Sequence, residues 1–481
     1  MRWALTGLRP LKLVATILVV ALFSACSSVP QQTGTVLPFA VPSAWSDTGV
    51  TATSPARSLV TWWSYFNDPL LSQLVGTALQ ANTSIVGAQA SLRQSRAQRD
   101  VAAAGLWPSL GSSASMQRGK SGGNSAANSF KVGLDASWEL DIFGAKRSAL
   151  SSSEALVEAN AATLGGTQVS VAAEVALAYI ALRNAQTRLA IARNNLASQA
   201  ETLQLTQWRL QAGLVTSLEA QQARASSEQT RAQLPALQTS IEQNSHALAV
   251  LTGQPPAALS AMLGAVQPVP QVSNTLALSM PLETLRQRPD VRAAEYQVTS
   301  AFALVSQANA ELAPSFKLGG SLGLNVLTLG SLTSGAALAT ALIASVSLPM
   351  FDGGALSARV RIQQAALTQA QVTYQATMLT ALKEVEDALI ALRGDRERLA
   401  SLQLASEAAA NAAQLARQRF DSGLVDFQTV LETQRTRLST QDNLASATAD
   451  ISADHVRLYK ALGGGWDPEV RASVASATST Y

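Results

Sequence analysis

Apolar and polar positions along the chain follow two periods, and each period marks a different kind of element. In segments 69–104 and 291–312, apolar and alanine residues recur every three or four positions, which is the spacing of one face of an α-helix. Pro108 and Pro314 follow these segments, and a proline inside a helix removes a backbone hydrogen bond. The pattern therefore predicts one helix in each half of the chain, ending shortly before its proline.

After each proline the period changes to two. Apolar residues take every second position in FKVGLDASWEL (130–140) and most such positions in FKLGGSLGLNV (316–326). A weaker partner strand is predicted at about 110–118 and a second partner strand at 341–348, each across a loop rich in Gly, Ser, Asn or Thr. Segments of about ten residues with alternating polarity are typical of outer-membrane strands, although two ordinary hairpins would show the same pattern.

The longest helical pattern follows each strand pair. Ser148–Gln211 and Ala355–Asp421 contain no proline, and their apolar and alanine positions alternate with Gln, Asn, Ser and Thr. At about 1.5 Å per residue, a continuous helix of this length would span roughly 100 Å. We expect one face of each helix to pack against neighbouring helices and another face to contact water.

The chain repeats itself at an offset of 210 residues. IALR occurs at 180–183 and again at 390–393, and WRLQAGLVTSLEAQQ (208–222) matches QRFDSGLVDFQTVLE (418–432). In both long stretches Gly-Leu-Val interrupts a helical pattern. A glycine at such a point can adopt the left-handed conformation that ends one helix before the next begins.

The repeat predicts two similar helix–hairpin–helix halves. We place the first repeat at 62–254, a linker at 255–280 and the second repeat at 281–465, followed by a C-terminal tail at 466–481.

The N-terminus has the layout of a secretory signal, with an N-terminal membrane anchor as the alternative. Three basic residues precede an apolar run at 13–23, which is too short to span a bilayer, and small residues follow it. The only cysteine, Cys26, stands where the signal would be cut. The sequence therefore predicts a signal peptide at 1–25 and an N-terminal extension at 26–61.

Composition and charge exclude several functions. Charged residues make up 14% of the chain and aromatic residues 5%, which suits closely packed alanine-rich helices better than a large globular core. The predicted signal holds three basic and no acidic residues, so its removal takes the formal charge from +3 to zero. No cluster of Lys and Arg indicates nucleic-acid binding. One cysteine and the distant His246 and His455 predict no disulfide, metal site, cofactor or enzyme.

Four strands per chain point to an assembly. An open sheet in lipid would leave backbone groups unpaired, at a cost of several kcal/mol each. Three copies would supply twelve strands, an even number within the bacterial range. The helices would then form a ring that extends away from the membrane.

The ordered set of features resembles the TolC-type outer-membrane efflux channels, in particular their OprM/NodT-like lipoprotein branch. The set comprises the opening WWSYFNDPLLSQLVGTALQANTSI (62–85), the duplicated halves and the paired glycine turns. The region around Cys26 resembles a lipobox, with Phe23 where leucine is usual and Ser27 favouring the outer membrane. The resemblance implies an α+β membrane protein with a long coiled-coil α-barrel and a twelve-stranded trimeric β-barrel.

The resemblance also implies a location and partners. The protein would be lipid-anchored at Cys26 on the periplasmic side of the outer membrane, in contact with outer-membrane lipid. As a homotrimer it would be the exit duct of a tripartite pump, passively conducting small toxic compounds or drugs. Its partners would be a periplasmic adaptor and an inner-membrane transporter of the RND type. The alternatives are a duct for type I protein secretion and a non-channel periplasmic coiled coil.

Two sets of site residues are carried over from the family. The glycine turns would be the periplasmic tips that dock the adaptor, although a helical hairpin loop without a partner is the alternative. The tip residues are Gly213, Leu214, Val215, Gly423, Leu424 and Val425.

The second set is a gate. Glu432 lies nine residues after Gly423, where the family usually has an aspartate that forms a ring across the pore, whereas the first repeat has Gln222. Three converging carboxylates would repel one another and attract cations. The alternative is that Glu432 pairs with Arg435 or Gln428 on a solvated helix face. Polar contacts between helices would help to hold the tip closed, through Arg419, Asp421 and Asp426.

Overall fold

The computed structural model describes most of the 481-residue chain, and the chain divides into two compact units that each combine both repeats. The described residues are 42, 45, 59–120, 122, 126–272, 285–328, 330 and 338–467. Cys26, the predicted signal and most of the predicted C-terminal tail lie outside them. The first unit contains Ala97–Ala155 and Val298–Gln371, and the second contains Val41–Arg96, Leu156–Gln297 and Val372–Tyr481.

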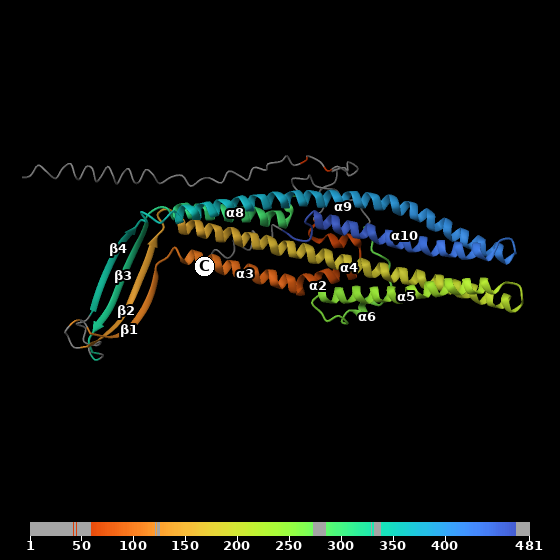
Figure 1. Cartoon of the computed structure of the whole chain (residues 1–481), viewed down its shortest axis with the longest axis horizontal. Coiled ribbons are helices and arrows are strands. Elements are labelled where there is room, and N and C mark those ends of the chain that lie inside the picture. Colours follow the sequence, from red (N-terminus) through yellow and green to blue (C-terminus); the bar gives the residue numbers. More distant parts are fainter. Residues whose placement is uncertain are drawn as a thin grey trace, which may run out of the picture. The chain divides into compact units, whose positions relative to one another are not determined.

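The first unit holds an antiparallel sheet of four strands in the order β1-β2-β3-β4 (Figure 1). The strands are β1 (Ser109–Gly119), β2 (Ala127–Leu140), β3 (Ser315–Val326) and β4 (Leu338–Ser347). All four strand predictions are confirmed, with ends that differ by up to three residues. β1 and β4 are the edges of this sheet, and each leaves backbone groups free to pair with a further strand.

The strand register gives the sheet one apolar and one polar face. Leu134 lies opposite Leu322, and Trp138 lies opposite Leu318, so large apolar side chains share a face. Residues between them point to the other face, where Glu139 pairs with Lys317 at 3.8 Å. The alternation read from the sequence therefore corresponds to a real division between two surfaces.

The second unit begins with short helices, and one of our predictions about them is wrong. After the 3-10 helix η1 (Leu59–Phe66), the predicted single helix at 69–104 is two helices, α2 (Pro69–Ala81) and α3 (Thr83–Ala104). Asn82 separates them because its backbone is extended, with φ −65° and ψ 131°. Its side-chain oxygen accepts a hydrogen bond from the backbone N–H of Ser84 at 2.9 Å and so caps α3.

The long helices follow the prediction closely. The two proline-free runs are the continuous helices α4 (Ala145–Gln211) and α9 (Ala355–Asp421). Each is followed by a 35-residue helix, α5 (Ser217–Leu251) or α10 (Phe427–Ala461). Two further helices are α6 (Ser260–Leu263) and α8 (Pro289–Ala310), the latter close to the predicted 291–312.

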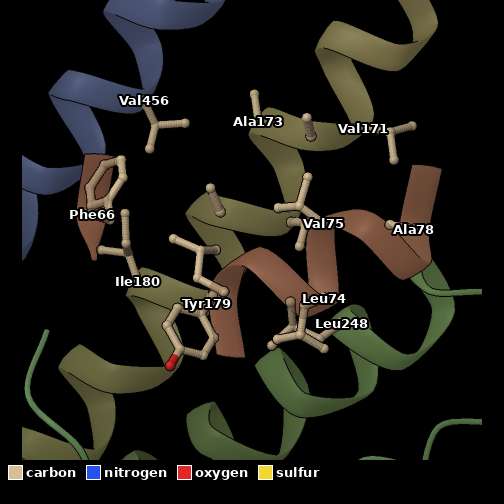
Figure 2. Packing of buried hydrophobic residues seen from close by; sticks show 14 of the residues in the cluster. Phe66, Leu74, Val75, Ala78, Val171, Ala173, Tyr179, Ile180, Leu248 and Val456 are labelled. Atoms are coloured by element: carbon tan, nitrogen blue, oxygen red, sulfur yellow. The ribbon is translucent and has the colours of Figure 1, made fainter. Parts of the chain in front are cut away.

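The main hydrophobic core lies where η1 and α2 pack among α4, α5 and α10. Figure 2 shows Phe66 and Leu74 beside Ile180 of α4, Leu248 of α5 and Val456 of α10. Because these residues come from both repeats, the core joins the two halves of the chain.

A buried hydrogen bond joins α4 to the start of α2 at this core. The Tyr179 hydroxyl donates a hydrogen bond of 2.7 Å to Asp68, whose carboxylate also caps the N-terminus of α2. Burial raises the pKa of Tyr179 to about 12, so the hydroxyl remains protonated and keeps this hydrogen bond.

The duplication is visible at the ends of helices α5 and α10 as well as in the order of the helices and strands. Gly253 and Gly463, 210 residues apart, both have positive φ, at 71° and 75°. Beside Gly253, the side-chain amide of Asn82 donates to the carbonyl of Leu251 at 2.9 Å. Beside Gly463, Arg288 donates to the carbonyl of Ala461 at 2.7 Å. An amide and a guanidinium thus make the same connection in the two repeats.

Candidate functional site

The two glycine turns have the same backbone geometry. Gly213 ends α4 and Gly423 ends α9, both with φ of 73°. The next residue donates its N–H to the carbonyl five positions back, from Leu214 to Arg209 and from Leu424 to Arg419, at 2.8 Å in each case. These are Schellman caps, in which a glycine supplies the left-handed residue that the turn requires. The predicted conformation of both glycines is confirmed.

The following helices begin with different caps. The backbone N–H of Thr216 donates to Glu219 at 2.7 Å at the start of α5. At the start of α10, Asp426 accepts from the backbone N–H of Thr429 at 2.9 Å. Hydrogen bonds from Thr429 lower the pKa of Asp426. Asp426 therefore acts as a helix cap within one chain, and its part in holding the tip closed stays a prediction about the assembled channel.

Each turn exposes one large apolar side chain. Leu214 and Leu424 are both 74% exposed, whereas Val215 and Val425 are half-buried. Two leucines with the same exposure at repeat-equivalent positions give the chain two matching apolar points beyond the ends of its longest helices.

Asp421 does make a contact between helices. Its carboxylate lies 3.3 Å from the guanidinium of Arg209, which links α9 to α4 just behind the tips. The same guanidinium lies 4.6 Å from the centre of the Phe420 ring. A second ion pair, Glu201–Arg417 at 3.0 Å, joins the same two helices. The side chain of Arg419 is exposed and forms no ion pair within the described residues.

Glu432 lies on an exposed face of α10. Its carboxylate is 3.8 Å from Arg435, and both side chains are more than half exposed. This is the alternative arrangement considered above, and such exposed pairs contribute little stability. Within one chain, Glu432 is therefore free to face a neighbouring copy without breaking a strong interaction.

A row of polar contacts, which no local sequence pattern predicts, joins α4 to α10. Arg188 forms a two-pronged ion pair with Asp442, at 2.7 and 3.0 Å. Closer to the tips, Asn195 donates to Gln441 at 2.9 Å and Gln434 donates to Thr202 at 3.0 Å. We call these three pairs the α4–α10 ladder.

Within the described part of the chain, no group of three or more His, Cys, Asp and Glu residues is arranged to hold a metal ion. His455 is buried against Tyr459, and burial lowers its pKa to about 4. His246 lies exposed on α5.

Comparison with known proteins identifies the family to which this architecture belongs. The family described as outer membrane efflux protein matches residues 74–254 and 280–464. Nodulation protein T of Rhizobium leguminosarum bv. viciae is 30% identical over 425 residues, covering 87% of this chain and 88% of that protein. The pyoverdine export outer membrane protein OpmQ of Pseudomonas aeruginosa is 33% identical over 473 residues, covering 93% and 96%.

Solved structures agree. The outer-membrane channel OprN is 38% identical, with a TM-score of 0.83, and covers 90% of this chain and 100% of its own. The open state of the Neisseria gonorrhoeae MtrE channel is 28% identical, with a TM-score of 0.83, over 92% and 98%. With both repeats matched and the fold shared over nine tenths of its length, this chain belongs to the outer membrane efflux protein family, the TolC-type trimeric channels that work with periplasmic adaptors and inner-membrane pumps.

Proposed function

We propose that three copies of this chain form a passive exit duct for small toxic compounds delivered by an RND-type pump and its adaptor, and that the duct performs no catalysis. The observation that carries this proposal is the pair of matching tips, in which Leu214 and Leu424 are equally exposed. The names of relatives support small cargo. They include the toluene efflux pump protein TtgF of Pseudomonas putida and the pyoverdine export protein OpmQ.

The tips are the proposed docking points for the adaptor. An exposed leucine keeps apolar surface in water, and covering it on binding would stabilise a complex by about 2 kcal/mol. Two such residues would give each chain two apolar contacts, flanked by the half-buried Val215 and Val425. Lipidation at Cys26 remains part of the proposal and would hold the duct at the membrane.

The docking role can be tested in cells that lack the native gene. We expect the double variant Leu214→Asn, Leu424→Asn to form normal trimers but to restore little efflux of a panel of small compounds. A loss of about 2 kcal/mol per tip corresponds to roughly thirtyfold in affinity for the adaptor.

Val266→Asn is the matched control, since Val266 is also largely exposed, at 65%, but lies in the linker between the repeats. Full efflux by the double leucine variant would remove the tips from the docking role. Unchanged accumulation of every compound on deletion of the gene would instead contradict the exit-duct function itself.

The second tip is the proposed gate. In a trimer, three copies of Glu432 would converge on the axis, while Arg209–Asp421 would hold α9 against α4 behind them. A ring of carboxylates attracts cations and narrows the pore. The first repeat carries Gln222 at the equivalent position and would not contribute charge.

We expect Glu432→Ala to raise the single-channel conductance of the reconstituted trimer and to reduce its preference for cations. Gln222→Ala is the matched control and should change neither property. If Glu432→Ala leaves conductance and ion preference unchanged, the carboxylate does not line the gate.

A further inference from the structure

The apolar face of the four-stranded sheet ends at two cations. In the register of β1 and β2, Met116 lies opposite Phe130, and the next position on the same face places Arg118 opposite Asn128. Lys120 directly follows β1. Both cationic side chains are exposed, and neither forms an ion pair or a hydrogen bond with the described part of the chain. Two positive charges therefore stand unneutralised at one end of an apolar surface.

This end of the sheet lies at the outer surface of the membrane. Helices α3 and α4 join β1 and β2 at the opposite end of the strand pair, and the helices of this family extend into the periplasm. The apolar positions of β2 run from Phe130 to Leu140. Eleven residues at about 3.3 Å each, tilted by about 40°, cover roughly 25 Å, which is the height of the apolar band of an outer-membrane barrel. Arg118 therefore lies one step beyond the band, at the level of the outer headgroups.

No carboxylate shares this region with the two cations. Residues 109–134 and 315–347 contain no Asp or Glu. Asp135 of β2 lies on the polar face of the sheet, where it accepts a hydrogen bond of 3.1 Å from Ser113. Cations at a membrane surface attract anionic lipid headgroups, and here no side chain of opposite charge competes for them.

A groove lies on the same apolar face, further into the membrane. Its volume is about 590 Å³, which is within the usual range for ligand pockets. The small side chains of Ser112 and Ala114 leave room for it on β1, and Ala114 is four residues before Arg118 on the same strand. The larger side chains that line the groove are all apolar and belong to the other three strands. They are Val132, Leu134, Leu322, Leu324 and Leu338.

We propose that the groove and the two cations together bind lipopolysaccharide of the outer leaflet. An acyl chain occupies the groove, and Arg118 and Lys120 bind phosphate groups of the lipid A headgroup. A guanidinium matches phosphate because it can donate two parallel hydrogen bonds. Lipid A carries phosphates on a glycolipid of the outer leaflet, so more than one cation can be neutralised by one molecule, whereas a phospholipid such as phosphatidylglycerol has a single phosphate. The proposal depends on the barrel and not on the cargo of the duct or on the tips.

Titration of the delipidated trimer with lipopolysaccharide in detergent tests the cations. Native mass spectrometry can count the lipid molecules on each trimer. Each charge removed should weaken binding about fivefold, so the variant Arg118→Gln, Lys120→Gln should bind about twenty-five times more weakly than the wild type. The matched control is Lys131→Gln, Lys317→Gln, which removes the same charge from the polar face and should leave the affinity unchanged.

A second pair of variants tests the groove. Ala114→Phe places a ring in the groove without altering any charge, and it should also weaken binding of lipopolysaccharide. Leu342→Phe is the matched control, because Leu342 is 85% exposed on the same face of β4 but does not line the groove. Lipid A without its phosphates should bind the wild type no more tightly than it binds the Arg118→Gln, Lys120→Gln variant.

The mass of the trimer in detergent shows whether each variant assembles, and the single variants Arg118→Gln and Lys120→Gln should each show the fivefold loss. Wild-type affinity in the Arg118→Gln, Lys120→Gln variant would overturn the proposal, as would an equal loss in the Lys131→Gln, Lys317→Gln variant. The assignment to lipopolysaccharide is also overturned if phosphatidylglycerol binds equally tightly.

Discussion

At the scale of single residues, the duplication exposes where the two repeats have diverged. Asp454 lies on α10 near Asp395 of α9, and its side chain is only 2% exposed. The Arg457 guanidinium donates a hydrogen bond of 2.6 Å to its carboxylate. Burial is the largest cause that raises its pKa, to about 6, and nearby Asp395 raises it further while Arg457 opposes both. The first repeat has Asn244 at the equivalent position, so an amide is already accepted in this architecture.

This residue gives a pH-dependent prediction. Because the folded chain binds the Asp454 proton more tightly than the unfolded chain, stability falls as pH rises from about 4 to above 6. Asp454→Asn should remove that loss, which is at most about 3 kcal/mol. The difference in melting temperature between the variant and the wild-type trimer in detergent should therefore become more positive from pH 4.5 to pH 7.5.

Taking the difference cancels the opposite trend expected from His455, whose lowered pKa disfavours the folded chain at acidic pH. Asp450→Asn is a suitable control, because Asp450 pairs with Arg398 at an exposed site. A difference that stays constant across this pH range would show that Asp454 does not titrate as described.

At the scale of elements, the sequence predicts turns that depend on neighbouring residues, but it does not predict contacts between residues far apart in the chain. The two Schellman turns were predictable because a glycine at the end of a helix acts through hydrogen bonds only three to five residues long. The break at Asn82 was missed because apolar spacing continues across it, although an asparagine before Thr-Ser is a known N-cap signal. The α4–α10 ladder was out of reach, since Arg188 and Asp442 are 254 positions apart.

The tip contacts give a prediction that uses the repeat as its own control. Arg209 is held by Asp421 and Phe420, whereas its equivalent, Arg419, forms no ion pair in the described part of the chain. If the pair holds the second hairpin in its closed position, Arg209→Gln should raise the conductance of the reconstituted channel, and Arg419→Gln should have a smaller effect.

The charge removed is the same in both variants, so the comparison isolates the contact. Equal effects from the two substitutions would point to general loss of positive charge at the tip. A larger effect from Arg419→Gln would mean that the contact holding the tip lies between chains.

At the scale of the whole molecule, the repeat and the two polarity periods were sufficient to predict the elements and the family, but not which faces are covered. Ile180 and Ile390 stand at the same position of the IALR motif, which does not show that one is covered and the other exposed. Their burial differs because η1, α2 and α10 pack near the first and no described element covers the second. That difference depends on tertiary contacts, and only the structure shows it.

The strand order of the sheet also constrains how the molecule is made. β1–β2 and β3–β4 are hairpins of neighbouring strands, but β2–β3 pairing joins residues such as Lys131 and Asn325, which are 194 positions apart. Contacts of such long range form slowly because a long loop must close first. The helical turns can form as the chain emerges, whereas the four-stranded sheet must wait until β3 and β4 of the second repeat have been made. Until β2 pairs with β3, the chain therefore consists of two separate hairpins whose apolar faces are exposed to water. These hairpins must reach the membrane before they aggregate, which is a kinetic requirement that the folded structure does not show.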